Sequence, residues 1–234
     1  MGKIYAGTSG WAYASWKPDF YPAKLASAKF LEHYASRLNS VEVNYTFRRR
    51  PTKSLLKRWV AATPQDFQFA VKAHQSITHV LRMHDAAEAT RSFLGALDPL
   101  RKAKKLGPVL FQLPPYLKCD VARLREFLKE LPKELRAAFE FRHESWFTEE
   151  VYAALRTAGA ALCAAESEKM QTPDVSTSDF HYLRLRKVDY SAEAVAQKVR
   201  RLGNSADVYV YFKHEDTPEG AFNAEAVLRA ANKP

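Results

Sequence analysis

The sequence predicts an α/β fold, a single TIM-type (β/α)8 barrel spanning residues 1–234, with an irregular sixth βα unit. Eight short apolar runs alternate with amphipathic segments, which is the order of parallel strands and their connecting helices. Eight such units in 234 residues fit a closed barrel better than an open sheet. Charged or amide side chains also occupy alternate positions in several runs, so the two faces of the sheet meet different environments.

The predicted strands are short runs that are apolar or alternate between apolar and polar residues, bounded by turn-forming residues. They are Lys3–Gly7, Ser40–Tyr45, Phe67–Lys72, Val109–Gln112, Ala137–Arg142, Ala161–Ala165, His181–Arg186 and Val208–Phe212.

Helices are predicted after seven of these strands, because apolar residues recur there at three- and four-residue spacing. They are Ser27–Leu38, Thr52–Ala61, Asp85–Lys105, Asp120–Leu131, Thr148–Thr157, Ser191–Leu202 and Gly220–Ala231. Ser27, Thr52, Asp120 and Thr148 are expected N-caps, because their short polar side chains accept a hydrogen bond from the first helical turn.

The sixth unit departs from this pattern. Residues 166–179 are polar and include Pro173, which predicts an extended loop with little room for a full helix. An open doubly wound sheet is the alternative fold. However, Gly7-Thr8-Ser9-Gly10-Trp11 after the first strand lacks the G-x-G-x-x-G spacing of a dinucleotide-binding turn, which weighs against that fold.

Composition predicts a soluble globular protein, with 47% hydrophobic and 26% charged residues. No apolar run approaches the roughly 20 residues that a membrane-spanning helix needs. The first residues show no export-signal pattern, so we expect a cytoplasmic location. Cys119 and Cys163 lie far apart, so neither a disulfide framework nor a thiolate metal site is expected. No cofactor is predicted.

The net charge of +10 and the isoelectric point near 9.5 favour polyanionic partners. Basic residues concentrate in four clusters, Arg48–Arg50, Arg101–Lys105, Arg184–Lys187 and Lys198–Arg201. Each cluster taken alone fits a solvated helix or loop face. Their sum suggests a small anion or a nucleic acid as partner.

In a barrel, the apolar positions of each strand face the helices and the alternate positions point inward. The outer layer is then expected to hold Val41, Val43, Tyr45, Phe67, Phe69 and Val71. The inner set is expected to hold Glu42, Asn44, Gln68, Lys72, Leu110, Gln112, Glu140, Arg142, Tyr182, Arg184 and Arg186.

The polar inner residues fall late in each strand, at the end where barrel active sites form. A pocket lined by Asn44, Lys72, Gln112, Arg142 and Arg184 is therefore predicted at that end, which we call the barrel mouth. The alternative is purely structural. In that alternative Glu42, Lys72, Glu140 and Arg142 neutralise one another as a buried ion-pair network.

Several motifs resemble a known family over almost the whole chain. The motifs are Gly7–Tyr13 with Trp16 and Phe20–Pro22, Val41–Phe47, Phe69–Ala73 with Ile77–His79, Leu110–Pro115, Glu140–Trp146 and Val208–Phe212. Together they resemble the domain-of-unknown-function family number 72, also called the YecE-like family. The resemblance implies a TIM-type barrel and does not imply a settled activity.

Three positions depart from the pattern expected for that family. Arg48 stands where the family usually has tyrosine, Arg186-Lys187 where a histidine-glycine pair is expected, and Lys213 where asparagine is expected. All three changes add positive charge near the predicted mouth, so a family ligand that depended on these positions is not transferred to this chain.

The end of the last two strands is one candidate anion site. Barrels often hold phosphate beyond strands seven and eight, at a helix N-terminus. Arg184, Arg186 and Lys213 precede the turn Gly220–Asn223 there, and arginine can grip phosphate with two hydrogen bonds. A helix cap with exposed basic residues around it is the structural alternative.

Aromatic residues in the loops after the first and fifth strands support a second hypothesis. They are Trp11, Tyr13, Trp16, Phe20, Tyr21, Trp146 and Phe147. Aromatic platforms beside basic side chains suit the bases of a nucleic acid or sugars. The same residues could instead pack beneath the first long loop, which is the favoured alternative.

Glu42 and Glu140 form a candidate catalytic pair, as hydrolysis of a glycosidic bond would need. Lys72 and Arg142 beside them would keep both carboxylates ionised, which disfavours a general acid. A metal-dependent phosphoesterase would use these carboxylates with Glu166 and one histidine among His74, His79, His143 and His214. No His-x-x-x-His motif supports that hypothesis, so no metal site is predicted. Ser9 lacks a nucleophile elbow.

These observations lead to one functional prediction. We expect the polar, basic mouth to bind an anionic, phosphate-bearing small molecule or a nucleic acid, with catalysis left open. The alternative is a hydrolase acting on a phosphoester or glycosidic bond through Glu42 and Glu140, with or without a divalent metal. The predicted ligand-binding residues are Thr8, Ser9, Trp11, Asn44, Lys72, Gln112, Arg142, Arg184, Arg186 and Asn223.

Overall fold

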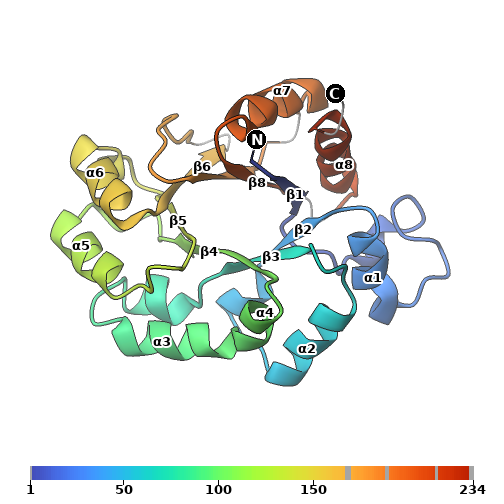
Figure 1. Cartoon of the computed structure of the whole chain (residues 1–234), viewed down its shortest axis with the longest axis horizontal. Helices are drawn as coiled ribbons and strands as arrows, with labels where there is room; N and C mark the ends of the chain where they lie inside the picture. Colours follow the sequence, from blue (N-terminus) through green and yellow to red (C-terminus); the bar gives the residue numbers. More distant parts are fainter. Residues whose placement is uncertain (1, 167–169, 188–189, 214–215, 232–234) are drawn as a thin grey trace.

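The computed structural model describes residues 2–166, 170–187, 190–213 and 216–231. It contains an eight-stranded parallel sheet in the order β1-β8-β7-β6-β5-β4-β3-β2, rolled into a nearly closed barrel with the helices outside (Figure 1). The strands are β1 (Ile4–Thr8), β2 (Ser40–Val43), β3 (Gln68–Lys72), β4 (Leu106–Gln112), β5 (Ala137–Glu140), β6 (Ala161–Glu166), β7 (Phe180–Leu185) and β8 (Asp207–Phe212). The predicted barrel is confirmed.

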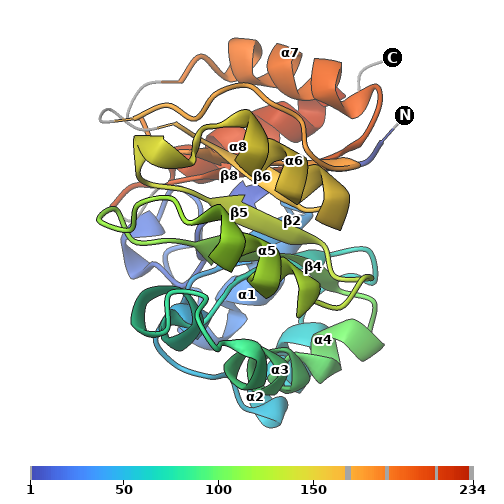
Figure 2. The same ribbon diagram turned by 90° about the vertical axis from the view of Figure 1, so that its left-hand side faces the viewer.

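The helices cover the outer face of the sheet. They are α1 (Phe30–Ala35), α2 (Lys53–Ala61), α3 (Ala87–Ala96), α4 (Asp98–Lys102), α5 (Val121–Lys129), α6 (Glu149–Ala158), α7 (Ala192–Gly203) and α8 (Glu219–Ala231). Figure 2 shows α5 and α6 lying outside β4, β5 and β6. Within the described ranges, no helix is both long and apolar enough to span a membrane.

Three of the four predicted N-caps are confirmed. The side chains of Thr52, Asp120 and Thr148 accept hydrogen bonds from the backbone amides of the first turns of α2, α5 and α6. Ser27 is the exception. It begins a short 3-10 turn, Ser27–Lys29, whose N-cap is Ala26, and α1 starts only at Phe30.

The single helix predicted over Asp85–Lys105 is wrong, because the chain forms α3 and α4 with a break at Leu97. Pro99 lies in the first turn of α4, where a missing amide hydrogen costs nothing, whereas inside a continuous helix it would remove a hydrogen bond. The five-residue π-helical turn Ser76–Val80 after β3 was also not predicted.

Strands β2 and β5 end earlier than predicted. The chain leaves β2 after Val43 and forms a 3-10 turn at Tyr45–Phe47, which leaves Tyr45 45% exposed instead of in the outer apolar layer. Likewise β5 ends at Glu140 and a 3-10 turn follows at Glu144–Trp146. The polar ends of the predicted strands therefore belong to the loops at the mouth.

The irregular sixth unit is confirmed for the residues described between β6 and β7. Gln171 forms an isolated antiparallel bridge with Glu166. The following segment lies antiparallel beside β6 and is held there by two buried threonines. Thr172 Oγ1 accepts a hydrogen bond from Ala165 N, and Thr177 Oγ1 accepts one from Leu162 N. The extended segment thus provides hydrogen-bond acceptors for two backbone amides of β6, a role that a helix in this place would not fill.

Side chains bridge the seam between β1 and β2, the two ends of the hydrogen-bonded order. The Asn39 amide accepts from Ala6 N at 2.9 Å and donates to the carbonyl of Ile4 at 2.8 Å. The Tyr34 hydroxyl lies 2.9 Å from Thr8 N and 3.0 Å from the carbonyl of Ser40. Gly7 allows this close approach, because a Cβ there would lie 1.9 Å from the Ser40 oxygen.

Two apolar layers lie on opposite faces of the strands. The outer layer contains the predicted Val41, Val43, Phe67, Phe69 and Val71 packed beneath the helices. The inner layer fills the barrel with small residues from β3, β5 and β6 and large aromatic residues from β7 and β8. Its members are Ala70, Leu110, Ala138, Ala161, Cys163, Ala165, Phe180, Tyr182, Tyr209 and Tyr211. Gln68, at the start of β3, lies at the opposite end of the barrel, and the other predicted polar inner residues lie at the mouth.

Candidate functional site

Arg184 is the centre of the polar network at the mouth. It lies near the end of β7 with 1% of its surface exposed, and its alternation with Tyr182 turns its side chain into the barrel. Its Nη2 donates to Glu42 Oε1 at 2.6 Å, and its Nη1 donates to Glu140 Oε2 in a short ion pair. One guanidinium therefore joins β2, β5 and β7 across the barrel.

Of the two basic residues expected beside the carboxylates, one pairs as predicted and one does not. Lys72 forms no ion pair with a carboxylate of the described residues. Its Nζ donates to Gln112 Oε1 at 2.9 Å and lies 4.0 Å from the centre of the Phe47 ring, a cation–π contact. Arg142 forms the predicted pair with Glu140, with 3.0 Å between Nε and Oε1. The sequence indicated all these inner residues except Phe47, but not which of them bond across the barrel.

Both carboxylates are held in their ionised form. Burial by itself would raise the pKa of Glu42, but the charge and hydrogen bonds of Arg184 outweigh it and hold the pKa at about 2. Burial opposes ionisation of Glu140 in the same way, and the nearby Arg184, together with Arg186 and Arg142, lowers its pKa. Ionised carboxylates are acceptors only, so neither group is suited to act as a general acid near neutral pH.

The network carries more positive than negative charge. Four basic side chains, Lys72, Arg142, Arg184 and Arg186, surround the two carboxylates, which leaves a formal charge of +2. Burial and the charge of Arg184 lower the pKa of Lys72 to about 8 and also lower the pKa of Arg186. The charges of Glu42, Lys72, Glu140 and Arg142 sum to zero, as in the structural alternative, but Arg184 and Arg186 add two further positive charges.

Several buried polar atoms of the network have no hydrogen-bond partner among the described residues. They are Arg184 Nε, Arg186 Nε and Asn44 Oδ1. Asn44 Nδ2 lies 3.3 Å from Glu42 Oε1, and the Tyr182 hydroxyl donates to the other oxygen of Glu42 at 2.8 Å. Unpaired buried donors are costly unless a ligand or water satisfies them. The two arginine donors favour a negatively charged ligand.

The predicted residues Thr8, Ser9 and Trp11, at and after the end of β1, are engaged in contacts within the protein. Thr8 is fully buried, and its hydroxyl donates to the carbonyl of Gly10 and contacts the Tyr34 hydroxyl. Ser9 uses its backbone, with its amide bonded to Phe212 and its carbonyl accepting from Tyr13 and, at 3.5 Å, from Asn44. Trp11 packs edge-on against Trp59. Asn44 thus connects this segment to the Arg184 network.

Asn223 lines a cavity of about 270 Å³ at the ends of β7 and β8, which shares Arg186 with the Arg184 network. The predicted turn Gly220–Asn223 is the first part of α8 itself. Arg186, Lys187 and Lys213 line this cavity, but so do the carboxylates of Asp216 and Glu219. Those two negative charges offset part of the basic character, so the Arg184 network is the stronger anion site.

Most of the aromatic residues considered for base stacking belong to the core. Trp16, Phe20, Tyr21 and Trp146 are at most 2% exposed. Tyr21 stacks on Phe30 with 4.2 Å between ring centres, and Trp146 stacks on Phe141 at 4.6 Å. These four residues therefore pack in the core, as the structural alternative expected. Trp11, Tyr13 and Phe147 are partly buried and pack against the same hydrophobic core.

The described residues contain no group of three histidine, cysteine, aspartate or glutamate side chains close enough to hold a metal ion. The Glu166 carboxylate pairs with Lys198 of α7 at 2.8 Å. His74 and His143 each bond a serine two residues later, and His79 bonds Thr78. His214 lies outside the described residues.

Comparison with protein families gives one match over nearly the whole chain. The family described as "Protein of unknown function DUF72" matches residues 5–234. Among curated proteins, UPF0759 protein YunF of Bacillus subtilis is 36% identical over 156 residues, covering 64% of this chain and 54% of YunF. UPF0759 protein YecE of Escherichia coli is 30% identical over 145 residues, covering 62% of this chain and 50% of YecE. The chain spans about half the length of these relatives.

Solved structures agree with this match. A DUF72 family protein from Thermotoga maritima superposes with a TM-score of 0.87 and 27% identity, covering 99% of this chain and 100% of that one. A DUF72 family protein from Enterococcus faecalis gives 0.82 and 21% identity over 99% and 96%. A family 2 AP endonuclease from Brucella melitensis gives 0.54 and 9% identity with full coverage of both chains, which is a likeness of fold alone.

Proposed function

This chain belongs to the DUF72 family, and we propose that its barrel mouth binds an anionic, phosphate-bearing ligand. The observation that carries the proposal is the surplus of positive charge around Arg184. Glu42 and Glu140 orient the Arg184 guanidinium, while Lys72, Arg142 and Arg186 supply charge that these two carboxylates do not neutralise. Phosphate suits such a site because its oxygens accept several charge-assisted hydrogen bonds.

The arrangement favours binding over acid–base hydrolysis. A glycosidase needs one carboxyl group with a raised pKa. Burial would raise the pKa of Glu42 and of Glu140, but the nearby arginines outweigh burial, and the pKa of each glutamate is lowered. A metal-dependent phosphoesterase needs a cluster of hard ligands, and none of three or more occurs in the described part of the chain. Hydrolysis through Glu42 and Glu140 is therefore the weaker alternative.

The direct test is calorimetric titration of the protein at low ionic strength with inorganic phosphate, a nucleoside monophosphate and a short oligonucleotide. Arg186→Gln should weaken phosphate binding at least about ten-fold, in line with the loss of one charged hydrogen bond. Arg125→Gln is the matched control, because Arg125 is an exposed residue of α5 paired with Glu150 and its loss changes the net charge equally. Absence of binding by all three probes, or equal effects of the two substitutions, would refute the proposal.

A nucleic acid is the second candidate ligand, favoured by exposed residues beside the mouth. Tyr45 and Tyr116, in the loops after β2 and β4, are 45% and 65% exposed, and Arg48–Arg50 are exposed nearby in sequence. Exposed aromatic and basic side chains together suit single-stranded nucleic acid. In the same titrations, an oligonucleotide should then bind more tightly than the monophosphate, with an affinity that falls steeply with salt. Equal affinity for both would limit the ligand to one phosphate group.

A further inference from the structure

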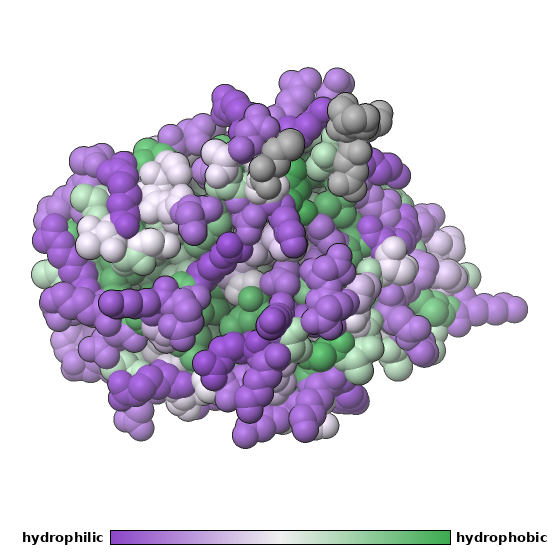
Figure 3. Space-filling model, viewed as in Figure 1, coloured by the Kyte–Doolittle hydropathy of each residue, from purple (hydrophilic) through white to green (hydrophobic). Residues whose placement is uncertain are grey.

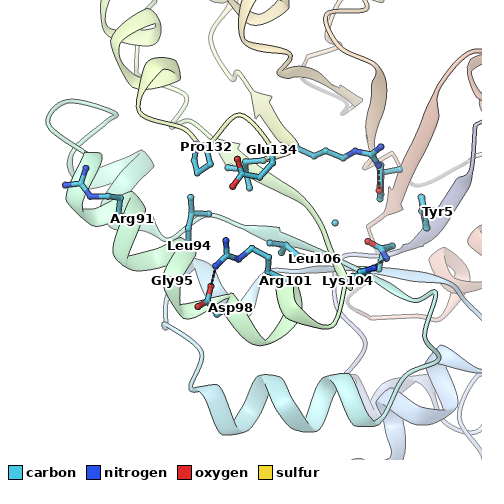
Figure 4. Close-up of a pocket in the computed structure, with 15 residues that line it drawn as sticks. Tyr5, Arg91, Leu94, Gly95, Asp98, Arg101, Lys104, Leu106, Pro132 and Glu134 are labelled. Atoms are coloured by element: carbon cyan, nitrogen blue, oxygen red, sulfur yellow. Dashed lines mark hydrogen bonds and ion pairs between the residues drawn. The ribbon is translucent and has the colours of Figure 1, made fainter.

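A cavity of about 580 Å³ lies at the end of the barrel opposite the mouth. Its inner wall comes from residues at or near the starts of strands, namely Tyr5, Gln68, Leu106 and Tyr209. Its outer wall comes from α3, α4 and the segment before β5. Figure 4 shows Leu94, Arg101 and Leu106 facing Pro132 and Glu134 across the cavity. None of the predicted ligand-binding residues lines it.

The cavity has an apolar body. Leu94, Leu106 and Leu135 line it, and the rings of Tyr5 and Tyr209 stack beside them at 4.6 Å with an angle of 11°. Figure 3 shows apolar residues within a mostly hydrophilic face of the molecule. Small-molecule sites of about 300–1,000 Å³ typically combine such apolar walls with a few polar groups.

The polar part of the wall is mainly basic. Arg91, Arg101, Lys104 and Arg136 line the cavity, against the two carboxylates of Asp98 and Glu134. Two of these cations are fixed in place by protein contacts. Arg101 Nη2 lies 2.6 Å from Asp98 Oδ1, and Arg136 Nη1 lies 2.8 Å from both Asp207 Oδ2 and the Tyr209 hydroxyl. A bound anion would meet a preorganised positive edge.

Lys104 provides a separate indication of function. It has a φ of 57° and lies two residues after the end of α4, with its amide bonded to the Arg101 carbonyl and the next amide bonded to the Leu100 carbonyl. This is the helix-ending position where glycine is strongly preferred, because a Cβ is strained there. The Gln68 amide also holds the Lys104 carbonyl, at 3.1 Å. A strained lysine in place of glycine puts a charge on the cavity wall at a cost to stability.

We propose that this cavity is a second binding site, for a small amphipathic anion with a flat apolar body, of the class of aromatic carboxylates and sulfonates. The leucines and the tyrosine pair would contact the apolar body, and Arg101 and Lys104 would bind the anionic group. Barrel catalysis is confined to the opposite end, so this is a non-catalytic site that is separate from the phosphate-binding proposal.

The test uses two dyes of nearly the same shape, anilinonaphthalene sulfonate and its uncharged analogue phenylnaphthylamine. Gly95 lines the cavity, and a Cβ added there meets no atom within 4 Å, so Gly95→Trp introduces bulk without a backbone clash. It should weaken binding of both dyes at least about ten-fold by filling the space. Glu88→Trp is the control, because Glu88 lies two turns earlier on α3, outside the cavity wall.

Charge is tested separately. Lys104→Gln should weaken binding of the sulfonate at least about three-fold and leave the uncharged dye unchanged. Lys102→Gln removes the same charge from α4 but does not line the cavity, so it should affect neither dye. Equal effects of Lys104→Gln and Lys102→Gln would overturn the assignment of the anionic group.

Thermal unfolding monitored by circular dichroism establishes that each variant is folded, and Gly95→Leu replaces Gly95→Trp if the latter is not. Dye binding that is the same in the Gly95 variant and in Glu88→Trp would overturn the proposal. So would binding abolished by Thr157→Trp, because Thr157 lines a different groove between α5 and α6. A crystal soaked with the sulfonate should show its naphthalene ring against Leu94 and Leu106.

Discussion

Arg184 and Glu42 form an ion pair across the inside of the barrel, with 2.6 Å between Nη2 and Oε1 and with exposed fractions of 1% and 0%. Removing two such charges from water is costly, and the pair is retained because each ion also has other partners. The Tyr182 hydroxyl donates to Glu42, and Glu140 accepts from Arg184. The pair fixes the position of one arginine at the centre of the mouth.

Arg184→Met should lower the free energy of unfolding by about 3–5 kcal/mol, because it leaves two buried carboxylates without their main counter-ion. Urea denaturation at neutral pH measures the effect. The triple variant Glu42→Gln/Glu140→Gln/Arg184→Met removes the charges together and should recover most of the stability, while losing phosphate binding. If Arg184→Met is as stable as the original protein, the ion pairs of Arg184 do not stabilise the fold.

The stability of the protein should fall at acid pH in a window set by Glu42. Burial raises the pKa of this carboxyl, but the charge and hydrogen bond of Arg184 outweigh burial and put the pKa at about 2, against 4.5 for an ordinary glutamate. Its contribution is therefore complete above pH 4.5 and is lost as the pH falls towards 2, an effect of order 3 kcal/mol. Unfolding free energies of Glu42→Gln measured across this range should show a shallower slope. Glu32→Gln, an exposed control at a residue that pairs with Lys29, should keep the original slope.

The inner positions of Glu42, Glu140 and Arg184 follow from the sequence, because alternation along a strand assigns each residue to a face without any knowledge of its neighbours. The bonds between them do not follow, since they join β2, β5 and β7 across the barrel. Which side chain reaches which depends on strand stagger and tilt, which a local pattern does not encode. For the same reason Lys72 was expected to pair with a carboxylate, although it binds Gln112 and the Phe47 ring.

The seam between β1 and β2 shows the same limit. Asn39 precedes β2, and Tyr34 is an apolar-face residue of α1, so in the sequence they resemble ordinary loop and core residues. Their role in bonding β1 appears only when the barrel closes. The break at Leu97 differs, because Pro99 two residues later is a local signal for a helix start that could have divided Asp85–Lys105.

Tyr34→Phe should open the seam locally. The hydroxyl is the partner of Thr8 N and of the Ser40 carbonyl, so its removal leaves buried polar groups unpaired at a cost of about 1–3 kcal/mol. Hydrogen exchange followed by NMR should show faster exchange at the Thr8 amide than in the original protein. Tyr116→Phe, at a residue that is 65% exposed, should change neither stability nor this exchange rate. Unchanged protection of Thr8 in Tyr34→Phe would show that backbone contacts close the seam.

Lys104→Gly should stabilise the protein by about 1 kcal/mol, because glycine adopts a φ of 57° without the strain that a Cβ causes. Lys57→Gly, in the middle of α2, should instead destabilise it by about 1 kcal/mol, because glycine is a poor helix former. Chemical denaturation of both variants measures the two changes in the free energy of unfolding, which should have opposite signs. Destabilisation by Lys104→Gly would mean that the lysine side chain makes contacts that outweigh the strain. Lysine at this position would then carry no stability cost that ligand binding has to explain.

Anion binding at the mouth should weaken as the pH rises through the pKa of Lys72. Burial and the charge of Arg184 lower this pKa to about 8, so the amine loses its charge in a range where lysine is normally protonated. Sulfate is the appropriate probe, because unlike phosphate it does not titrate near neutral pH. Its affinity, measured by calorimetry between about pH 7 and 9, should fall by several-fold, and binding should take up protons because the anion favours the charged amine. Lys72→Arg keeps the charge at all these pH values and should bind sulfate with a nearly constant affinity. The same pH dependence in Lys72→Arg and in the original protein would assign the titration to another group.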